Sequence, residues 1–590
     1  MSSRSALLPA PSRPRRLAAL GTSLCVGATL AAVATGATTA SVHAAAPPGD
    51  CAEAFPIADL AADDPVHGLT VSRGTTPEEF TGTVLGILED GIAPGRDMIM
   101  MDLDSTAIQD AGGIWQGMSG SPVYSEDGRL IGAVAYGLSW GSSPIAGVTP
   151  FEYMEGYLGP AAAPGLIDVP RAAAKKIAAT GEVTRTQAAQ GFRRLPVPMS
   201  VSGVSADRLE DGLKRKTKKR GYLKKNAYAA PAGGTTAAGE ETVVAGGNLA
   251  AVESAGDVTA GGVGTVTSVC GDRIVGFGHP MYFAGPVSYG LGAADAIYVQ
   301  PESLGAPFKV ANFGDIVGVI DQDRLTGIAG AFGPAPASTA FTSDLTYGGA
   351  AREGSTDIFV PDSLAWIAFY GALANHDVLL DRIGPGSETQ SWQIEGIDAD
   401  GTPFSISYGD RWTSPWDIAV DASYPLADVL WALTELAGVS VTSVTSTGEA
   451  TDEEATYSVK KIEQRRGGVW VNLAKRQAVV KAGKTLRLRA TLMAADGTTA
   501  TAPLSQKIPK RFAGTRTWGS VRGGGWGYID VWNAKSVADV VEALAEDPPN
   551  DAVSLDGRLR KRGTRLDFSA ESAPQDLVIF GSKSFTLRVK

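Results

Sequence analysis

Two stretches of the chain, residues 68–159 and 245–333, consist of short apolar runs separated by Gly, Pro and Asp. Such runs between turn residues are typical of β-strands, and the EDGRL segment within SPVYSEDGRLIGAVAYG predicts a hairpin. The 72 Gly among 590 residues exceed the usual share of about 7% without a collagen-like period. This excess favours turn-rich β structure over helical bundles, so we expect a mainly β fold.

The segment between these two blocks has a different composition. A short helix is predicted within residues 169–190 by the segment PRAAAKKIAATGE. Residues 214–225 are rich in Lys and Arg. AYAAPAGGTTAAGEE then has the composition of a flexible linker. We interpret the basic run as a solvated loop, with a processing site or a docking patch for an acidic partner as alternatives.

Beyond residue 350 the pattern changes again. PDSLAWIAFYGALANHDVLL predicts a helix after Pro361, PLADVLWALTELAG a helix opened by Pro425, and KSVADVVEALAED an amphipathic helix. Apolar alternation from Thr456, with turn signals at KAGKT and AADGT, is typical of an immunoglobulin-like β-sandwich. DADG at 398–401 lacks the full ligand set of a calcium loop and is interpreted as a plain turn.

At roughly 100–200 residues per domain, the length suggests three or four domains, or one large β-rich unit with additions. We predict a signal peptide at 1–44, a first β block at 45–165, a helix with basic loop and flexible linker at 166–244, a second β block at 245–345, a mixed α/β extension at 346–455, and a C-terminal β-sandwich-like region with a helix at 456–590.

The N-terminal 44 residues predict the compartment. They carry four Arg and no acid, then an apolar stretch from about Leu17 to Ala34 and the small-residue site Val42-His43-Ala44. This pattern is typical of a secretory signal peptide cut near Ala44, so we expect a secreted or extracytoplasmic protein, with a membrane anchor as the alternative. The mature chain has no further membrane-spanning stretch. The formal net charge of −11 falls to −15 after cleavage, which argues against nucleic acid as a partner.

Cleavage would also leave two cysteines, Cys51 and Cys270. In an oxidising compartment such a pair is a disulfide candidate. The remaining cysteine, Cys25, lies in the apolar stretch and lacks the small residues expected before a lipidated cysteine.

Several kinds of chemistry lack their motifs. No CxxC or HExxH is present, and no two of the four His lie within one helical turn, so we predict no metal site. The chain also lacks a phosphate-binding GxxxxGK[ST] loop and the context of a dinucleotide site. We therefore expect no cofactor.

One dense motif remains, Gly117-Met118-Ser119-Gly120-Ser121-Pro122. A Ser between glycines on a tight turn can expose its hydroxyl, while the backbone N–H groups of Gly117 and Ser119 can face a developing oxyanion. The pattern parallels the GDSGGP of chymotrypsin-like peptidases. A structural Gly/Ser hairpin is the alternative, and Ser121 is a second, weaker nucleophile candidate.

The run DSTAIQDAGGIWQGMSGSPVYSEDGRLIGAVAYG, from Asp104 to Gly137, resembles the SpoIVB-type serine peptidase family, peptidase family S55. GLTVSRGTTPEEFTGTVLGIL and SPIAGVTPFEYM are also similar to that family. GVGTVTSVCGDRIVGFGHP, with GDIVGVIDQDRLTGIAGAFG, resembles its other block. The resemblance covers roughly residues 66–160 and 245–335.

The resemblance implies a trypsin-like double β-barrel with a Ser/His/Asp triad. Ser119 matches the family nucleophile, Asp104 the acidic member and His279 the histidine, with an oxyanion hole from Gly117 and Ser119. Serine needs an adjacent base, and a carboxylate fixes the tautomer of that base. The order of the two blocks is permuted relative to the sporulation protease, because here the histidine follows the serine. The PDZ domain of that protein is not visible.

Other residues compete for two of these roles. His67 would give the order His-Asp-Ser but lies only 52 residues before Ser119, too few for two barrels. Asp102 shares a strand face with Asp104 and is its rival as the acid. We interpret His376 as a surface or packing residue in a helix.

The sequence thus predicts a secreted serine endopeptidase that cuts a protein or peptide substrate through an acyl-enzyme, with self-cleavage as a further expected reaction. The main alternative is a non-catalytic binding or scaffold protein on a peptidase-like fold. A third is a cell-surface adhesion or envelope module. An envelope-associated partner is a further candidate beside the protein or peptide substrate.

Overall fold

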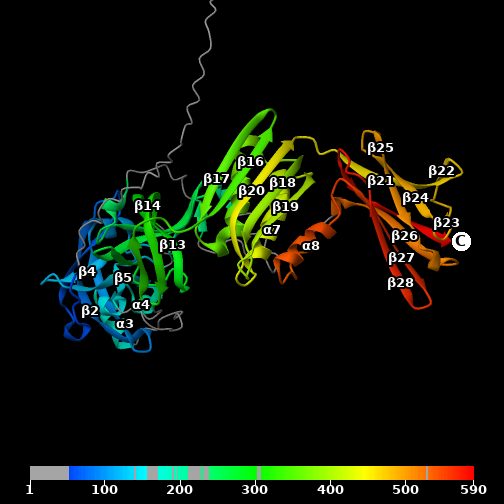
Figure 1. The fold of residues 1–590 in the computed structure, drawn as a ribbon. Coiled ribbons are helices and arrows are strands. Elements are labelled where there is room, and N and C mark those ends of the chain that lie inside the picture. Colours follow the sequence, from blue (N-terminus) through cyan, green and yellow to red (C-terminus); the bar gives the residue numbers. More distant parts are fainter. Residues whose placement is uncertain are drawn as a thin grey trace, which may run out of the picture. The chain divides into compact units, whose positions relative to one another are not determined.

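The computed structural model describes residues 52–138, 141–155, 171–188, 192–195, 197–209, 227–229, 238–301, 307–526 and 529–590. Strands dominate these residues, so the expected mainly β fold is confirmed (Figure 1). The predicted signal peptide, Cys51 and the basic run at 214–225 lie outside the described residues. No helix among the described residues is both long and apolar enough to span a membrane.

Six strands of the first β block close into a barrel. Their order is β1-β2-β3-β6-β5-β4, and β4 pairs back to β1. The strands are β1 (Pro65–Thr70), β2 (Glu78–Ala93), β3 (Arg96–Asp104), β4 (Pro122–Ser125), β5 (Leu130–Leu138) and β6 (Ile145–Pro150), and β7 (Phe192–Arg194) extends the β5 edge. The predicted EDGRL hairpin connects β4 and β5.

Five short helices belong to the same part of the described chain. They are η1 (Ile57–Asp59), α1 (Thr106–Ala111), α2 (Phe151–Met154), α3 (Arg171–Ala179) and α4 (Arg185–Ala188). The Ser105 hydroxyl caps α1 by accepting the N–H of Ile108 at 3.2 Å, and Gly112 ends it in the left-handed conformation. Helix α3 lies where PRAAAKKIAATGE predicts it.

Strands of the second β block also close into a ring of six, because β10 pairs with both β13 and β11. The ring order is β10-β13-β14-β15-β12-β11. The strands are β10 (Asn248–Gly256), β11 (Ala260–Cys270), β12 (Arg273–Gly276), β13 (Gly285–Gln300), β14 (Phe308–Arg324) and β15 (Gly327–Phe332). Nearby elements are β8 (Met199–Val201), β9 (Ala227–Ala229) and η2 (Glu240–Thr242). The likeness of the two rings to the trypsin fold stays a prediction.

Cys270, the last residue of β11, is disulfide-bonded. The predicted partner, Cys51, is outside the described residues, so the pairing itself stays a prediction.

The sheet of the second ring continues into the extension through β17, which pairs with β10. The further strands are β16 (Thr339–Tyr347), β17 (Ala350–Ile358), β18 (Gly386–Ile397), β19 (Pro403–Ser414) and β20 (Ser440–Thr451). The domain boundary predicted between residues 345 and 346 lies inside β16, which pairs with β17 and β20 of this extension.

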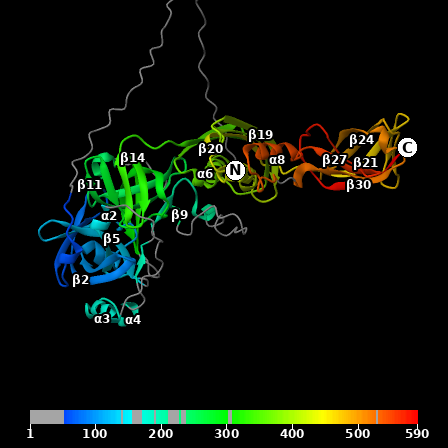
Figure 2. The same cartoon turned by 60° about the horizontal axis from the view of Figure 1, so that its bottom comes forward.

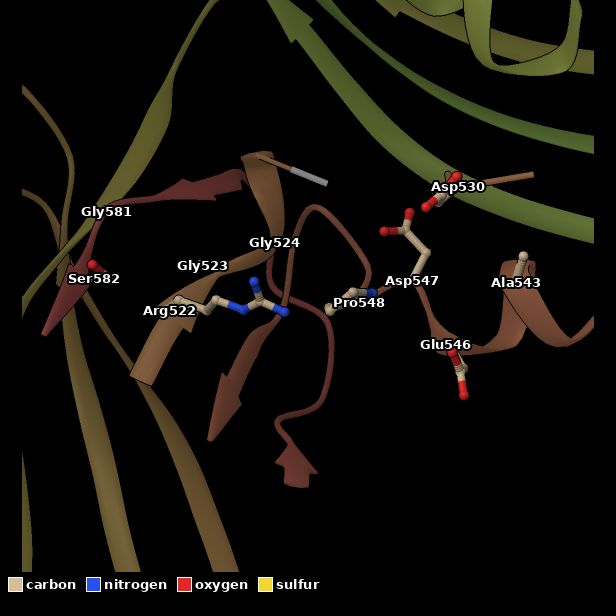
Figure 3. A pocket seen from close by; sticks show the side chains of 10 residues that line it. All are labelled: Arg522, Gly523, Gly524, Asp530, Ala543, Glu546, Asp547, Pro548, Gly581 and Ser582. Carbon is tan, nitrogen blue, oxygen red and sulfur yellow. The ribbon is translucent and has the colours of Figure 1, made fainter. Parts of the chain in front are cut away.

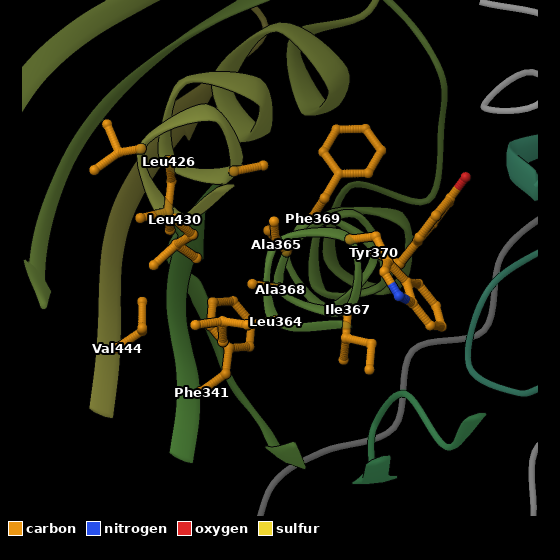
Figure 4. Close-up of a cluster of buried hydrophobic side chains, with 14 of the residues drawn as sticks. Phe341, Leu364, Ala365, Ile367, Ala368, Phe369, Tyr370, Leu426, Leu430 and Val444 are labelled. Carbon is orange, nitrogen blue, oxygen red and sulfur yellow. The ribbon is translucent and has the colours of Figure 1, made fainter. Parts of the chain in front are cut away.

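Two apolar helices, α6 (Leu364–Leu380, after η3 at Pro361–Ser363) and α7 (Ile418–Thr434), pack on this sheet (Figures 1 and 2). Figure 4 shows Leu426 and Leu430 of α7 beside α6, with Phe341 and Val444 of the sheet below them. The predicted start of α7 is wrong: the helix begins at Ile418, capped by the Asp417 carboxylate, and Pro425 lies in its interior.

The C-terminal region contains two five-stranded sheets around one apolar core. One sheet comprises β21 (Thr456–Arg466), β22 (Val469–Asn472), β24 (Thr485–Met493), β25 (Thr499–Lys507) and β29 (Val578–Phe580). The other comprises β23 (Ala478–Val480), β26 (Arg516–Gly523), β27 (Val553–Lys561), β28 (Thr564–Glu571) and β30 (Ser582–Val589). Helix α8 (Val537–Glu546) confirms the amphipathic helix, and η4 (Lys510–Phe512) and η5 (Gly524–Trp526) complete the region. An immunoglobulin-like topology stays a prediction.

Candidate active site

Ser119 lies in a tight turn between α1 and β4. The N–H of Met118 donates to the Trp115 carbonyl at 3.0 Å, and the N–H of Ser121 donates to the Met118 carbonyl at 3.0 Å. Gly117 and Gly120 have φ of +94° and +99°, a conformation that residues with a Cβ rarely adopt. The glycines on either side of Ser119 are therefore required by the turn itself.

This turn is bound to β11 of the second ring. The Ser119 carbonyl accepts the N–H of Thr265 at 2.8 Å. The Thr265 and Thr267 hydroxyls donate to the carbonyls of Gly117 and Gly120 at 3.1 Å and 2.7 Å. A Cβ on Gly120 would lie 1.9 Å from the Thr265 carbonyl oxygen, so only glycine permits this approach. The two rings thus meet at the serine turn.

His279 follows β12 in the second ring. Phe277 and Gly278, just before it, both have φ of +67°. The Gly278 carbonyl accepts a hydrogen bond from the Thr149 hydroxyl of β6 at 2.7 Å, which ties the histidine segment to the first ring. The residue before His279 is therefore hydrogen-bonded to the first ring.

The structure brings Ser119 and His279 together, 160 residues apart in sequence. The distance from His279 Nε2 to Ser119 Oγ is 2.9 Å. His279 Nδ1 lies 2.9 Å from the Pro280 carbonyl oxygen, which can only accept. Nδ1 therefore carries the proton, and Nε2 is the acceptor for the Ser119 hydroxyl. This is the tautomer that a general base needs.

The environment of His279 keeps its imidazole neutral. Burial and, to a lesser extent, the positive charge of Arg194 lower the pKa of His279 to about 3, although the hydrogen bond to the Pro280 carbonyl opposes both effects. The side chain of His279 is 0% exposed and Ser119 is 3% exposed. Both residues are therefore buried at the junction of the two rings.

The position of Asp104 differs from the prediction, which put its carboxylate behind His279. Asp104 is the exposed last residue of β3, and its Oδ1 accepts the side-chain amide of Gln109 at 2.7 Å. The Nδ1 that a triad carboxylate would hold is bonded to the Pro280 carbonyl instead. The structure thus does not bring Asp104 to the imidazole.

Asp102, the rival acid, lies in the same pocket of the first ring as Asp104 and Glu182. Burial, together with the charges of Glu182 and Asp104, raises the pKa of Asp102. Neither Ser119 nor His279 lines this pocket. Both candidates for the acidic triad member thus line a pocket that does not include His279.

The two other described histidines lie apart from Ser119. His67 on β1 stacks on Tyr124 with ring centroids 5.7 Å apart. His376 is buried within α6, where Nε2 is 2.6 Å from the Glu388 carboxylate. The helical position predicted for His376 is confirmed, and it packs inside the extension.

The two amides predicted for the oxyanion hole are free to donate. Among the described residues, neither the N–H of Gly117 nor that of Ser119 has an acceptor. The carbonyl on the same peptide as the Gly117 N–H, that of Gln116, accepts the N–H of Lys309 at 2.9 Å. Because that peptide is trans, the Gly117 N–H points away from β14. Strand β14 thereby fixes the orientation of this donor.

Two residues at the junction were missed by the sequence reasoning. Lys309 is completely buried against Gly117, and its Nζ donates to Asn248 Oδ1 at 2.8 Å. Burial lowers the pKa of Lys309 to about 7, opposed by the charge of Glu78. Asp323, at the end of β14, is also completely buried. The sequence signal for these buried residues is a charged side chain within a mainly apolar strand. Lys309 lies in FKVANF and Asp323 lies in GVIDQDRLTG.

Other parts of the described chain offer less. Figure 3 shows a pocket beside α8, with Arg522 across from Asp547 and Glu546, and no histidine among its ten lining residues. Within the described ranges, no three His, Cys, Asp or Glu side chains converge as metal ligands would.

Comparison with known proteins gives one match. The family model of the SpoIVB peptidase S55 matches residues 55–145, which confirms the resemblance. The matched segment contains Asp104 and Ser119 and ends before His279. At the level of the family it supports a SpoIVB-like serine peptidase. No curated protein and no solved structure matches the chain.

Proposed function

We propose that this chain, whose residues 55–145 match the SpoIVB peptidase S55 family, is a secreted serine endopeptidase. Ser119 Oγ attacks a peptide carbonyl, His279 Nε2 takes the hydroxyl proton, and the N–H groups of Gly117 and Ser119 hold the oxyanion. His279 gives this proton to the amine as the C–N bond breaks, which leaves the acyl-enzyme. In the second step His279 takes a proton from the attacking water and returns it to Ser119 Oγ as the C–O bond of the acyl-enzyme breaks and the acid product leaves.

The observation that carries this proposal is the 2.9 Å contact between His279 Nε2 and Ser119 Oγ, with the Nδ1 proton held by a carbonyl. A general base must lie within hydrogen-bond reach of the proton that it removes. Neutral imidazole is the form that can accept a proton, and the lowered pKa of His279 maintains this form at neutral pH. The two rings supply one residue each, as trypsin-like barrels would.

The burial of the pair suggests a closed state. Ser119 and His279 are almost inaccessible, so substrate binding requires a movement at the junction of the rings. Self-cleavage within residues 214–241, which are basic and Gly/Ala-rich, is one reaction that would fit such an enzyme. The protein substrate and an envelope-associated partner belong to the same proposal.

The test compares wild type with Ser119→Ala, both secreted as full chains, by intact mass. We expect a start near residue 45 in both proteins and further truncation in wild type only. Casein cleavage that is present in wild type and absent in Ser119→Ala would agree. Identical masses and no casein cleavage by either protein would contradict the enzyme proposal.

The second candidate is a non-catalytic scaffold on the same fold. The observation that favours it is the exposed position of Asp104, away from His279. This candidate predicts that Ser119→Ala changes neither processing nor any binding activity.

A further inference from the structure

Asp323 is a carboxylate buried directly behind the histidine segment. Its side chain is 0% exposed. Oδ1 accepts the N–H of Met281 at 2.8 Å, and Oδ2 accepts the N–H groups of Tyr282 at 2.8 Å and Ala284 at 3.3 Å. All three donors lie within five residues after His279. The segment that carries the histidine is thus wrapped around one carboxylate.

A buried carboxylate is costly unless its oxygens are hydrogen-bonded. Burial raises the pKa of Asp323, and the backbone N–H groups oppose that rise. The hydroxyl of Tyr289 also hydrogen-bonds to this carboxyl. Backbone N–H groups can only donate, so the segment is built for the ionised acid.

One of these hydrogen bonds reaches the imidazole. The N–H of Met281 and the carbonyl of Pro280 belong to the same peptide group. Every described peptide is trans, so this N–H and this carbonyl point in opposite directions. Asp323 holds the N–H, and the carbonyl on the other side accepts His279 Nδ1–H at 2.9 Å. The carboxylate and the imidazole are therefore connected through one peptide.

We propose that Asp323 positions His279 by acting through the Pro280–Met281 peptide. The carbonyl of this peptide contacts Nδ1, where the carboxylate of a triad would touch the ring. This inference rests on the proposed function. A carboxylate at the N–H end polarises the peptide, which strengthens the carbonyl as an acceptor. Asp323 is a positioning residue, because it touches neither the substrate nor the reacting atoms.

The proton balance of the step is simple. The Ser119 proton moves to His279 Nε2 as Oγ forms its bond to the carbonyl carbon, and the electron pair of the broken C=O π bond moves to the oxygen that the Gly117 and Ser119 N–H groups hold. The Nδ1 proton stays on Nδ1 and keeps its hydrogen bond to Pro280. Asp323 stays ionised and exchanges no proton. The carbonyl dipole, fixed by Asp323, stabilises the transient imidazolium.

The test uses the full secreted chain as wild type, Asp323→Asn, Asp323→Glu and Asp321→Asn. Asp321, two residues earlier on β14, is a half-exposed partner of Arg273 and provides the matched control. The first readout is the rate of fluorophosphonate labelling at Ser119 between pH 4 and 9. The second is the ¹⁵N spectrum of the histidine rings, which distinguishes the two neutral tautomers.

We expect Asp323→Asn to slow labelling on the order of 10- to 100-fold, as for loss of a hydrogen bond to a charged group. Asp323→Glu restores part of the rate, and Asp321→Asn labels like wild type. The pH below which the labelling rate declines should not rise in Asp323→Asn. If Asp323 only held the fold, its loss would hydrate His279 and raise this pH toward the usual histidine pKa of about 6.5.

The outcomes separate this inference from the proposed function. A wild type that does not label at Ser119 contradicts the enzyme itself. A wild type that labels, with Asp323→Asn equally fast, overturns the inference and leaves the enzyme standing. If Asp323→Asn does not fold, the wild-type spectrum decides: an Nδ1-protonated His279 supports the inference, and an Nε2-protonated one overturns it.

Discussion

Gly120→Ala tests the contact that joins the two rings. The new Cβ would lie 1.9 Å from the Thr265 carbonyl oxygen and 2.5 Å from the Phe277 nitrogen. Ordinary contact begins at 3.4 Å, so the turn and β11 must separate by roughly 1.5 Å. A shift of that size takes Ser119 Oγ beyond hydrogen-bond distance of His279 Nε2.

The free energy of unfolding should fall for two separate reasons. The positive φ of Gly120 costs an alanine about 1–2 kcal/mol. Overpacking against Thr265 adds about 1–3 kcal/mol, for a total of about 2–5 kcal/mol. Gly128→Ala is the matched control: its φ is +82° but no atom lies within 4 Å of its Cβ, so it incurs only the first cost.

The assay is urea unfolding of both variants, paired with fluorophosphonate labelling of the folded proteins. We expect Gly128→Ala to label like wild type and Gly120→Ala to lose most of its labelling while still folded in part. Equal stability and equal labelling of the two variants would refute the docking of the serine turn on β11.

Two further predictions concern buried ionisable groups. Lys309 has a pKa lowered to about 7, so the free energy of unfolding should fall as pH drops from about 10.5 to 7. Lys309→Met should remove this pH dependence of the unfolding free energy in urea titrations. An unchanged pH dependence would contradict the burial of the Lys309 ammonium group. His376 is buried, which opposes its charged form, but the charge and hydrogen bond of Glu388 raise its pKa overall. The stability from this pair should be complete below about pH 6.5 and lost as pH rises through the raised pKa. His376→Gln should flatten that decline in urea titrations, and an unchanged decline would contradict the pairing with Glu388.

Much of the local structure follows from the sequence. The turn residues in EDGRL, KAGKT and AADGT separate strands where the apolar runs predict them, and the three helices of the second half lie close to their expected positions. Pro425 led to a wrong start for α7, because proline often lies in the first turn of a helix. In the structure α7 begins earlier, at Ile418, where the Asp417 carboxylate caps it. Tertiary burial of α7 outweighs the hydrogen bond that the proline lacks.

The candidate site was only partly predictable. Glycines around Ser119 and the resemblance to a peptidase family led to Ser119 and His279, but no local pattern specifies a contact between residues 160 apart. The partner of Nδ1 is a backbone carbonyl, which leaves no side-chain signature at all. Asp323 looks like any acid at a strand end until the fold wraps residues 281–284 around it. Such roles depend on backbone direction, which apolar periodicity does not encode.

The central claim is that Ser119 is a nucleophile activated by His279. The most direct measurement is intact mass, followed by peptide mapping, of the secreted protein after treatment with a fluorophosphonate. We predict a single adduct on Ser119 in wild type, no adduct in Ser119→Ala, and labelling slower by on the order of 100-fold or more in His279→Gln. Absence of an adduct in wild type, or labelling of Ser119 that is independent of His279, would contradict the account.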